Sequence, residues 1–419
     1  MVERSGLLQN IGWLSGAQVF TRLLQFAAYA SLARRLGEIG FGRFAYAFSL
    51  LDMVAFTATL GLPILYTRHL AAGRMAHASA TVISKHRMTL IVAFIGGLWL
   101  FLAPPDLALD LLVMMFLAML LRGYHHFGAS GLRGKEQMRG EALASVGGRL
   151  VFTLLAGGGV WLVDDLGGML RITFVGFLVG EMVNLLLINR AMKSLGLSWT
   201  PTPPSPHQQK QVWREMVPFA AAGLFGLIAF RVDLVMIREL STPLMADHRA
   251  GNYGAAYRIL EAGLFLPGAI AAALFPALVR RRQGDELPRN LFRRAVLILL
   301  GLGLLGGAVL YLGAPYLIRA FAGEGYELAV PALAALGLAV PFLFVNFILG
   351  TGVFALGKEW WGFLGLFVSL ILNIVGNYYV ITRYPNEALI GAALFTAASE
   401  AVLTCSQLVI LKLAKRAND

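Results

Sequence analysis

The sequence predicts an all-α integral membrane protein with about twelve transmembrane helices arranged in two six-helix bundles. Its composition is the first observation: 58% of the 419 residues are hydrophobic and only 14% are charged, whereas about a quarter of the residues of a soluble globular chain are charged. Second, apolar runs of about 20 residues, the length that crosses a bilayer, recur along the whole chain. Third, charged and glycine motifs of the first half return in the second.

Twelve apolar runs are long enough to be spans, and short connections separate them. They begin near Asn10, Phe41, Ala80, Leu107, Leu143, Gly167, Met216, Gly251, Phe292, Ala329, Trp360 and Ala388. The first run is too long for a signal peptide and lacks a small-residue cleavage site, so we expect it to remain as the first span.

The net charge of +12 is explained by topology rather than by nucleic-acid binding. Most basic residues fall in alternate connections, beginning with the N-terminus. The opposite connections hold only Arg34, Arg35, Arg43, Arg238, Arg249, Arg319 and Arg383. Because cytoplasmic loops of membrane proteins are enriched in Lys and Arg, both termini are expected to be cytoplasmic.

An internal repeat divides the chain into two halves. Sliding one half onto the other aligns Arg22 with Arg231, Gly42 with Gly251 and Asp52 with Glu261 without a gap. LRGKE at 132–136 likewise matches ALGKE at 355–359. Since each half contains an even number of spans, we expect a pseudo-twofold axis along the membrane normal, with the substrate site between the halves.

These features predict three segments: an N-terminal bundle at 1–195, a cytoplasmic linker at 196–213 and a C-terminal bundle at 214–419. The linker contains WTPTPPSPHQQKQ at 199–211. Its prolines favour extended, solvated chain, so no helix is expected there.

Charged residues lie inside several predicted spans, most visibly in FRVDLVMI at 230–237. Counting residues from the nearest turn places Arg22 level with Asp52, Arg231 level with Glu261, and Asp233 level with Arg258. We therefore expect Asp233 to pair with Arg258, while Arg231 is available to Glu261 or to substrate. An arginine at the centre of a bilayer costs about 2.5 to 3.5 kcal/mol even on permissive scales. Two interpretations stay open: buried pairs that pin helices together, or groups that line an aqueous path and contact a charged substrate.

The acidic residues of the spans are candidates for ion coupling. Asp52, Asp233, Glu261, Glu181 and Glu400 could bind a proton or sodium ion, or could pair with arginine. Asn184, Asn373 and Asn377 are expected to make polar contacts between helices. The adjacent His125 and His126 are expected near the cytoplasmic interface, and no metal site or cofactor is predicted.

Several long segments resemble the polysaccharide flippases, which export lipid-linked oligosaccharides and belong to the superfamily that also contains the multidrug and toxic-compound extruders. The segments are GLRGKEQMRGEALASVGGRL, GNYGAAYRILEAGLFLPGAIAAALFPALVR and GKEWWGFLGLFVSLILNIVGNYYVITRY. This resemblance implies that the protein moves an undecaprenyl-pyrophosphate-linked oligosaccharide from the cytoplasmic to the periplasmic leaflet of a bacterial inner membrane by alternating access. The resemblance also implies a basic cavity, and its candidate residues are Arg22, Arg231, Arg258 and Arg149. The candidate partners are membrane lipids and polysaccharide polymerase or assembly proteins. The cycle would be coupled to a proton or sodium gradient or to the membrane potential.

Two other functions compete with this one. An ion-coupled multidrug or cation extruder would share the fold, and the five acidic residues favour it, whereas arginines at matched positions of both halves argue against it. A membrane enzyme is disfavoured because every predicted external loop is short. GLRGKE is not a phosphate loop, since Lys135 is followed by Glu136 instead of Ser or Thr.

Overall fold

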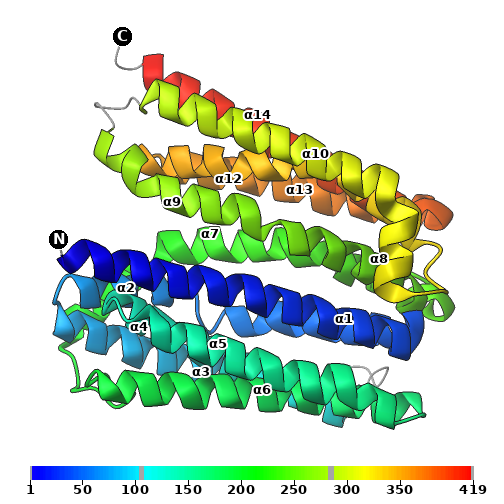
Figure 1. Ribbon diagram of the computed structural model, residues 1–419, viewed down its shortest axis with the longest axis horizontal. Helices are drawn as coiled ribbons and strands as arrows, with labels where there is room; N and C mark the ends of the chain where they lie inside the picture. Colours follow the sequence, from blue (N-terminus) through cyan, green and yellow to red (C-terminus); the bar gives the residue numbers. More distant parts are fainter. Residues whose placement is uncertain (1, 103–107, 282–286, 417–419) are drawn as a thin grey trace. The chain divides into compact units, whose positions relative to one another are not determined.

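The computed structural model describes residues 2–102, 108–281 and 287–416, which form helices and connections without a strand (Figure 1). The first half contains α1 (Val2–Phe56), α2 (Leu62–Ala71), α3 (Met75–Leu102), α4 (Leu109–Gly134), α5 (Met138–Phe152), η1 (Thr153–Gly158), η2 (Gly159–Leu162) and α6 (Leu166–Ser194). The second half contains α7 (Pro206–Glu239), α8 (Pro243–Gly263), α9 (Phe265–Arg281), α10 (Arg289–Ala322), α11 (Ala329–Gly337), α12 (Val340–Ala355), α13 (Glu359–Arg383), η3 (Pro385–Glu387) and α14 (Ala388–Arg416).

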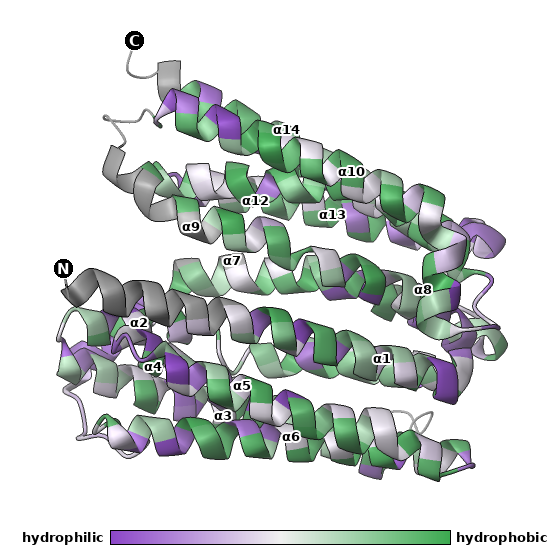
Figure 2. Ribbon diagram, in the orientation of Figure 1, coloured by the Kyte–Doolittle hydropathy of each residue, from purple (hydrophilic) through white to green (hydrophobic). Residues whose placement is uncertain are grey.

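The all-helical membrane fold predicted from the sequence is confirmed. Within the described ranges, nine helices are long and apolar enough to span a membrane, and α11 with α12, bent by 44°, makes a tenth if the pair is one span. Hydrophobic residues are spread along the long helices in Figure 2, for example on α6, α10 and α13. The count is lower than twelve partly because α1 is counted once, although it consists of two helices that meet at a kink at Gly37, where φ is 62° and ψ is 178°. The eighth predicted span is likewise divided between α8 and α9.

Contacts within the chain define two compact units. Unit 1 comprises Met1–Leu36 and Ala47–Leu224, and unit 2 comprises Gly37–Tyr46 and Phe225–Asp419. A short stretch of α1 therefore packs with the second half of the chain, and α7 contributes its beginning to unit 1 and its end to unit 2.

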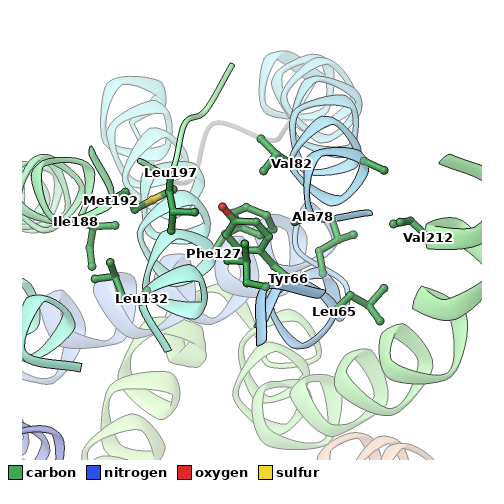
Figure 3. Packing of buried hydrophobic residues seen from close by; sticks show 14 of the residues in the cluster. Leu65, Tyr66, Ala78, Val82, Phe127, Leu132, Ile188, Met192, Leu197 and Val212 are labelled. Carbon is green, nitrogen blue, oxygen red and sulfur yellow. The ribbon is translucent and has the colours of Figure 1, made fainter. Parts of the chain in front are cut away.

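An apolar cluster holds α2, α4 and α6 together at one end of unit 1 (Figure 3). The rings of Tyr66 and Phe127 stack with centroids 4.5 Å apart. Gly131 permits this packing, because a Cβ there would lie 2.6 Å from the Tyr66 ring. Val212, at the beginning of α7, belongs to the same cluster, so the connection between the halves is anchored to unit 1.

The predicted linker is shorter than expected. Helix α7 begins at Pro206, inside the segment for which no helix was predicted. Proline is well tolerated in the first turn of a helix, because the N–H groups there have no partner within the helix. The non-helical part is tied to α3, where a ring nitrogen of His86 lies 2.7 Å from the carbonyl oxygen of Trp199.

Unit 2 contains the two glycines that the repeat aligns. Gly42 lies on the stretch of α1 assigned to unit 2, and Gly251 lies on α8. A Cβ on Gly42 would lie 2.0 Å from the carbonyl oxygen of Asp247, and one on Gly251 would lie 1.8 Å from that of Glu38. The repeated glycines thus mark one backbone crossing, which only a residue without a side chain permits.

Candidate functional site

Unit 2 holds a buried group in which two arginines share one carboxylate. Arg231 of α7 donates to Glu261 Oε1 at 2.7 Å, and Arg258 of α8 donates to Glu261 Oε2 at 2.7 Å. Of the two partners left open for Arg231, Glu261 is in contact with it, and Arg258 reaches the same carboxylate from one helical turn away. With two guanidinium groups and one carboxylate, this Arg231–Glu261–Arg258 triad carries a net positive charge and can attract an anion.

Asp233 is not paired with Arg258, so that prediction was wrong. Asp233 is 1% exposed, and its carboxylate accepts from three neutral donors. These are the Tyr253 hydroxyl at 3.0 Å, Asn377 Nδ2 at 2.7 Å and Thr396 Oγ1 at 2.7 Å. The donors come from α8, α13 and α14, so this carboxylate joins four helices of unit 2.

Oxygen atoms gather around the same carboxylate. Asn377 Nδ2 also donates to Asn373 Oδ1 at 3.2 Å, while Asn377 Oδ1 is buried without a hydrogen-bond partner in the structure. The O and N positions of an amide are interchangeable by a flip. We call Asp233, Tyr253, Asn373, Asn377 and Thr396 the Asp233 nest.

Glu400 lies in a separate polar contact on α14. Asn346 of α12 donates to Glu400 Oε2 at 2.7 Å, and Thr404 donates to Asn346 Oδ1 at 2.7 Å. The partners of Glu400 are therefore neutral side chains, like those of Asp233.

In unit 1 the corresponding carboxylate has a titratable partner. Glu181 of α6 lies 2.9 Å from His125 Nδ1 and accepts from Asn184 Nδ2 at 3.2 Å. All three residues are buried. His125 is buried among the side chains of unit 1, within α4, which continues to Gly134.

Asp52 of α1 forms an ion pair with Arg122 of α4, across 3.8 Å. The expected partner, Arg22, makes no ion pair with any residue that the structure describes. Arg149 of α5 packs its guanidinium 5.7 Å from the centroid of the Phe152 ring. Of the four predicted cavity arginines, the structure therefore brings Arg231 and Arg258 together, while Arg22 and Arg149 lie in unit 1 without a carboxylate shared between them.

The sequence interpretation overlooked His125, Tyr253, Asn346 and Thr396 as partners of the acidic residues. Thr396 lies four residues before Glu400, on the same face of α14, which marks it as part of a polar stripe but does not identify Asp233 as its partner. Asn346 and Tyr253 had no such signal, because their partners lie on helices distant in the chain.

Comparisons with known proteins agree with this fold. The family model for polysaccharide biosynthesis proteins matches residues 7–281, and the MatE family model matches residues 282–379. No curated protein matches the sequence.

Among solved structures, the chain is similar to the lipid II flippase MurJ in an inward closed conformation, with TM-score 0.70, 15% identity and coverage of 95% of this chain and 87% of that one. It is also similar to an inward-facing multidrug resistance MATE family transporter of the MOP superfamily (TM-score 0.69, 15% identity, 94% of each chain). A third is the Vibrio cholerae MATE transporter VcmN in the bent form (TM-score 0.62, 15% identity, 99% of each chain). The chain belongs to the polysaccharide biosynthesis protein family and has the fold of the MOP-superfamily transporters.

Proposed function

We propose that this protein is a flippase that moves an undecaprenyl-pyrophosphate-linked oligosaccharide from the cytoplasmic to the periplasmic leaflet of a bacterial inner membrane. The Arg231–Glu261–Arg258 triad is the observation that carries the proposal. Arg231 and Arg258 are 12% and 5% exposed in their side chains, yet they share a single carboxylate. Two guanidinium groups held side by side in this way offer an anionic substrate a pair of charged donors during transport.

A pyrophosphate suits this triad. Guanidinium groups stay charged at all relevant pH values and bind phosphate oxygens through two parallel hydrogen bonds. When the substrate arrives, its oxygens would compete with Glu261 for Arg231, and Glu261 would keep Arg258 as a partner. The triad can thus open without leaving a carboxylate unpaired.

The Asp233 nest supports coupling of the cycle to a cation. A buried carboxylate without a cationic partner is costly as an ion, so it takes up a proton or a metal ion. Carboxylate, hydroxyl and amide oxygens are hard ligands that suit Na⁺. We assign the coupling ion to this nest, with Asp233 as the charged ligand and Thr396 and Asn377 as neutral ones.

Translocation in proteoliposomes tests the proposed function. Vesicles carry undecaprenyl-pyrophosphate oligosaccharide, and a membrane-impermeant glycosidase reports how much glycan has crossed. Loss of one charge-assisted contact worth about 1.5 to 3 kcal/mol predicts a rate about ten- to a hundredfold lower in Arg231→Ala. Arg231→Lys should keep more activity than Arg231→Ala because it retains the charge.

Arg171→Ala is the matched control. Arg171 of α6 also pairs with a carboxylate, that of Asp110 on α4 at 3.2 Å, but 63% of its side chain is exposed. Its rate should equal that of the wild type. Equal rates in wild type, Arg231→Ala and Arg171→Ala would remove the triad from the substrate path. If folded wild-type protein moves no lipid-linked glycan but exports cationic dyes, the multidrug extruder becomes the better assignment. The Asp233 nest, with its buried carboxylate, would then be the site for the cation.

A further inference from the structure

A groove runs between the first part of α1 and α5, within unit 1. It has a volume of about 580 Å³ and is lined by Trp13, Gly16, Ala17 and Phe20 of α1 and by Leu143 and Val146 of α5, among others. This volume falls in the range of about 300 to 1,000 Å³ typical of ligand sites. We call it the α1–α5 groove.

The groove is a wedge that is closed at one end. At the closed end, Thr153 Oγ1 donates to the carbonyl oxygen of Leu24 at 3.2 Å, and a Cβ on Gly157 would lie 3.1 Å from Ala28 Cα. The two segments therefore touch from Leu24 onward but stand apart around Gly16. The change occurs where α5 gives way to the π-helical turn η1, a feature that often accompanies functional sites.

An arginine side chain lies at the open end of the groove. The guanidinium of Arg139, one residue into α5, lies 5.4 Å from the centroid of the Trp13 ring. The positive-inside pattern expects this end of α5 at the cytoplasmic surface. An anionic head at Arg139 would therefore lie at the interface while an attached chain follows the groove into the membrane.

The shape and charge select one class of occupant. Apolar walls alone give no preference over bulk lipid, because acyl chains are as apolar as the groove. Selection must come from fit and from the head group. Gly16 and Ala17 present small side chains to the groove, and the two segments converge toward Leu24. A tapering groove of this kind suits one branched prenyl chain. Arg139 can bind the phosphate of that chain.

We propose that the α1–α5 groove holds the polyprenyl chain of an anionic prenyl-phosphate lipid, with its phosphate at Arg139. The identity of the lipid rests on the proposed function, whereas the place of its chain rests on the groove. The groove is then the site at which the substrate's tail is held on the cytoplasmic side before the head group moves.

Site-specific photo-cross-linking tests the inference. Benzoylphenylalanine replaces Leu143, which is 53% exposed, or Ile298 of α10, which is 57% exposed and serves as the matched control. The full-length protein is placed in phosphatidylethanolamine and phosphatidylglycerol vesicles that contain a small fraction of undecaprenyl phosphate, and mass spectrometry identifies the adducts. The ratio of prenyl to phospholipid adducts should be at least about tenfold higher at position 143 than at position 298. Equal ratios at the two positions would overturn the inference.

A second experiment fills the groove with a larger side chain. A Cβ on Gly16 meets no heavy atom within 4 Å, so Gly16→Leu fits without strain and occupies the groove. Gly97 of α3 also has open space around its Cβ, which makes Gly97→Leu the matched control. Gly16→Leu should abolish the enrichment at position 143, and Gly97→Leu should preserve it. Enrichment that survives Gly16→Leu would show that the prenyl chain is held elsewhere.

A third variant tests the proposed contact between Arg139 and the phosphate of the lipid. Arg139→Gln should lower the enrichment of undecaprenyl phosphate to that of uncharged undecaprenol, and unchanged enrichment would overturn the role of Arg139. Because these measurements use a lipid without a glycan, they do not depend on transport. Enrichment without glycan translocation would refute the proposed function alone, and translocation without enrichment would refute the groove alone.

Discussion

Gly251→Ala is expected to destabilise the protein far more than a typical glycine-to-alanine change in a helix. The added methyl group would lie 1.8 Å from the carbonyl oxygen of Glu38, whereas real Cβ contacts stay above 3.0 Å, so the two backbones must separate by at least about 1.2 Å. Overpacking of this kind costs about 1 to 3 kcal/mol. The separation also stretches the bond from Asn252 Nδ2 to Glu38 Oε2, now 2.9 Å long. These losses exceed the gain of about 1 kcal/mol that alanine brings to a helix interior.

The assay is the midpoint temperature at which purified protein in detergent loses its monomer peak. Gly301→Ala on α10 is the matched control, because nothing lies within 4 Å of a Cβ there. It should equal or exceed the wild type, while Gly251→Ala falls below it. Gly42→Ala should resemble Gly251→Ala, and the double variant should lose less than the sum, because one separation relieves both contacts. Equal midpoints for Gly251→Ala and Gly301→Ala would refute the close crossing of α1 and α8.

Two further predictions concern protons and cations. Burial lowers the pKa of His69 below its ordinary 6.5, although its contact with Glu215 acts in the opposite direction. The unfolded chain then binds more protons than the folded one, so the free energy of unfolding should fall as the pH drops through 6.5 toward the pKa of folded His69. The fall should be smaller in His69→Gln. Parallel pH profiles of the midpoint temperature in the two proteins would contradict this. Na⁺ at about 100 times its dissociation constant should stabilise the wild type by about 2.7 kcal/mol relative to choline and leave Asp233→Asn unaffected. Asp110→Asn, an exposed carboxylate, is the control, and the same Na⁺ shift in Asp233→Asn and the wild type would exclude the nest as the ion site.

The sequence predicted contacts that rest on local spacing or on the repeat. Arg258 and Glu261 are one helical turn apart, so their shared face follows from helix geometry alone. The pairing of Arg231 with Glu261 followed from residue counts on two consecutive helices joined by a short turn. The fold class likewise followed from apolar runs and their repetition, since the bilayer permits few alternatives to helices.

Contacts between distant helices were beyond the reach of such counts. Many side chains share one depth in a bundle, so depth alone could not choose Thr396 over Arg258 as a partner of Asp233. Helix length was the second source of error. Helices α3 and α4, of 28 and 26 residues, are longer than the minimal span of about 20 residues. Lys85, a basic residue on α3, is fully buried and donates to the carbonyl oxygen of Ala58 at 3.1 Å.

The buried glutamates of the two units have different kinds of partner. Glu181 of unit 1 contacts His125, which can take a proton, whereas Glu400 of unit 2 contacts Asn346, which cannot. Unit 2 also holds the triad and the neutral nest around Asp233. In a perfect repeat, both units would bind the same charges equally. In the proposed mechanism the anion binds the triad and the cation binds the nest, which are different groups of unit 2, so the two ligands need not compete directly. Such separation lets each ligand shift the conformational equilibrium through its own contacts, which coupled transport requires.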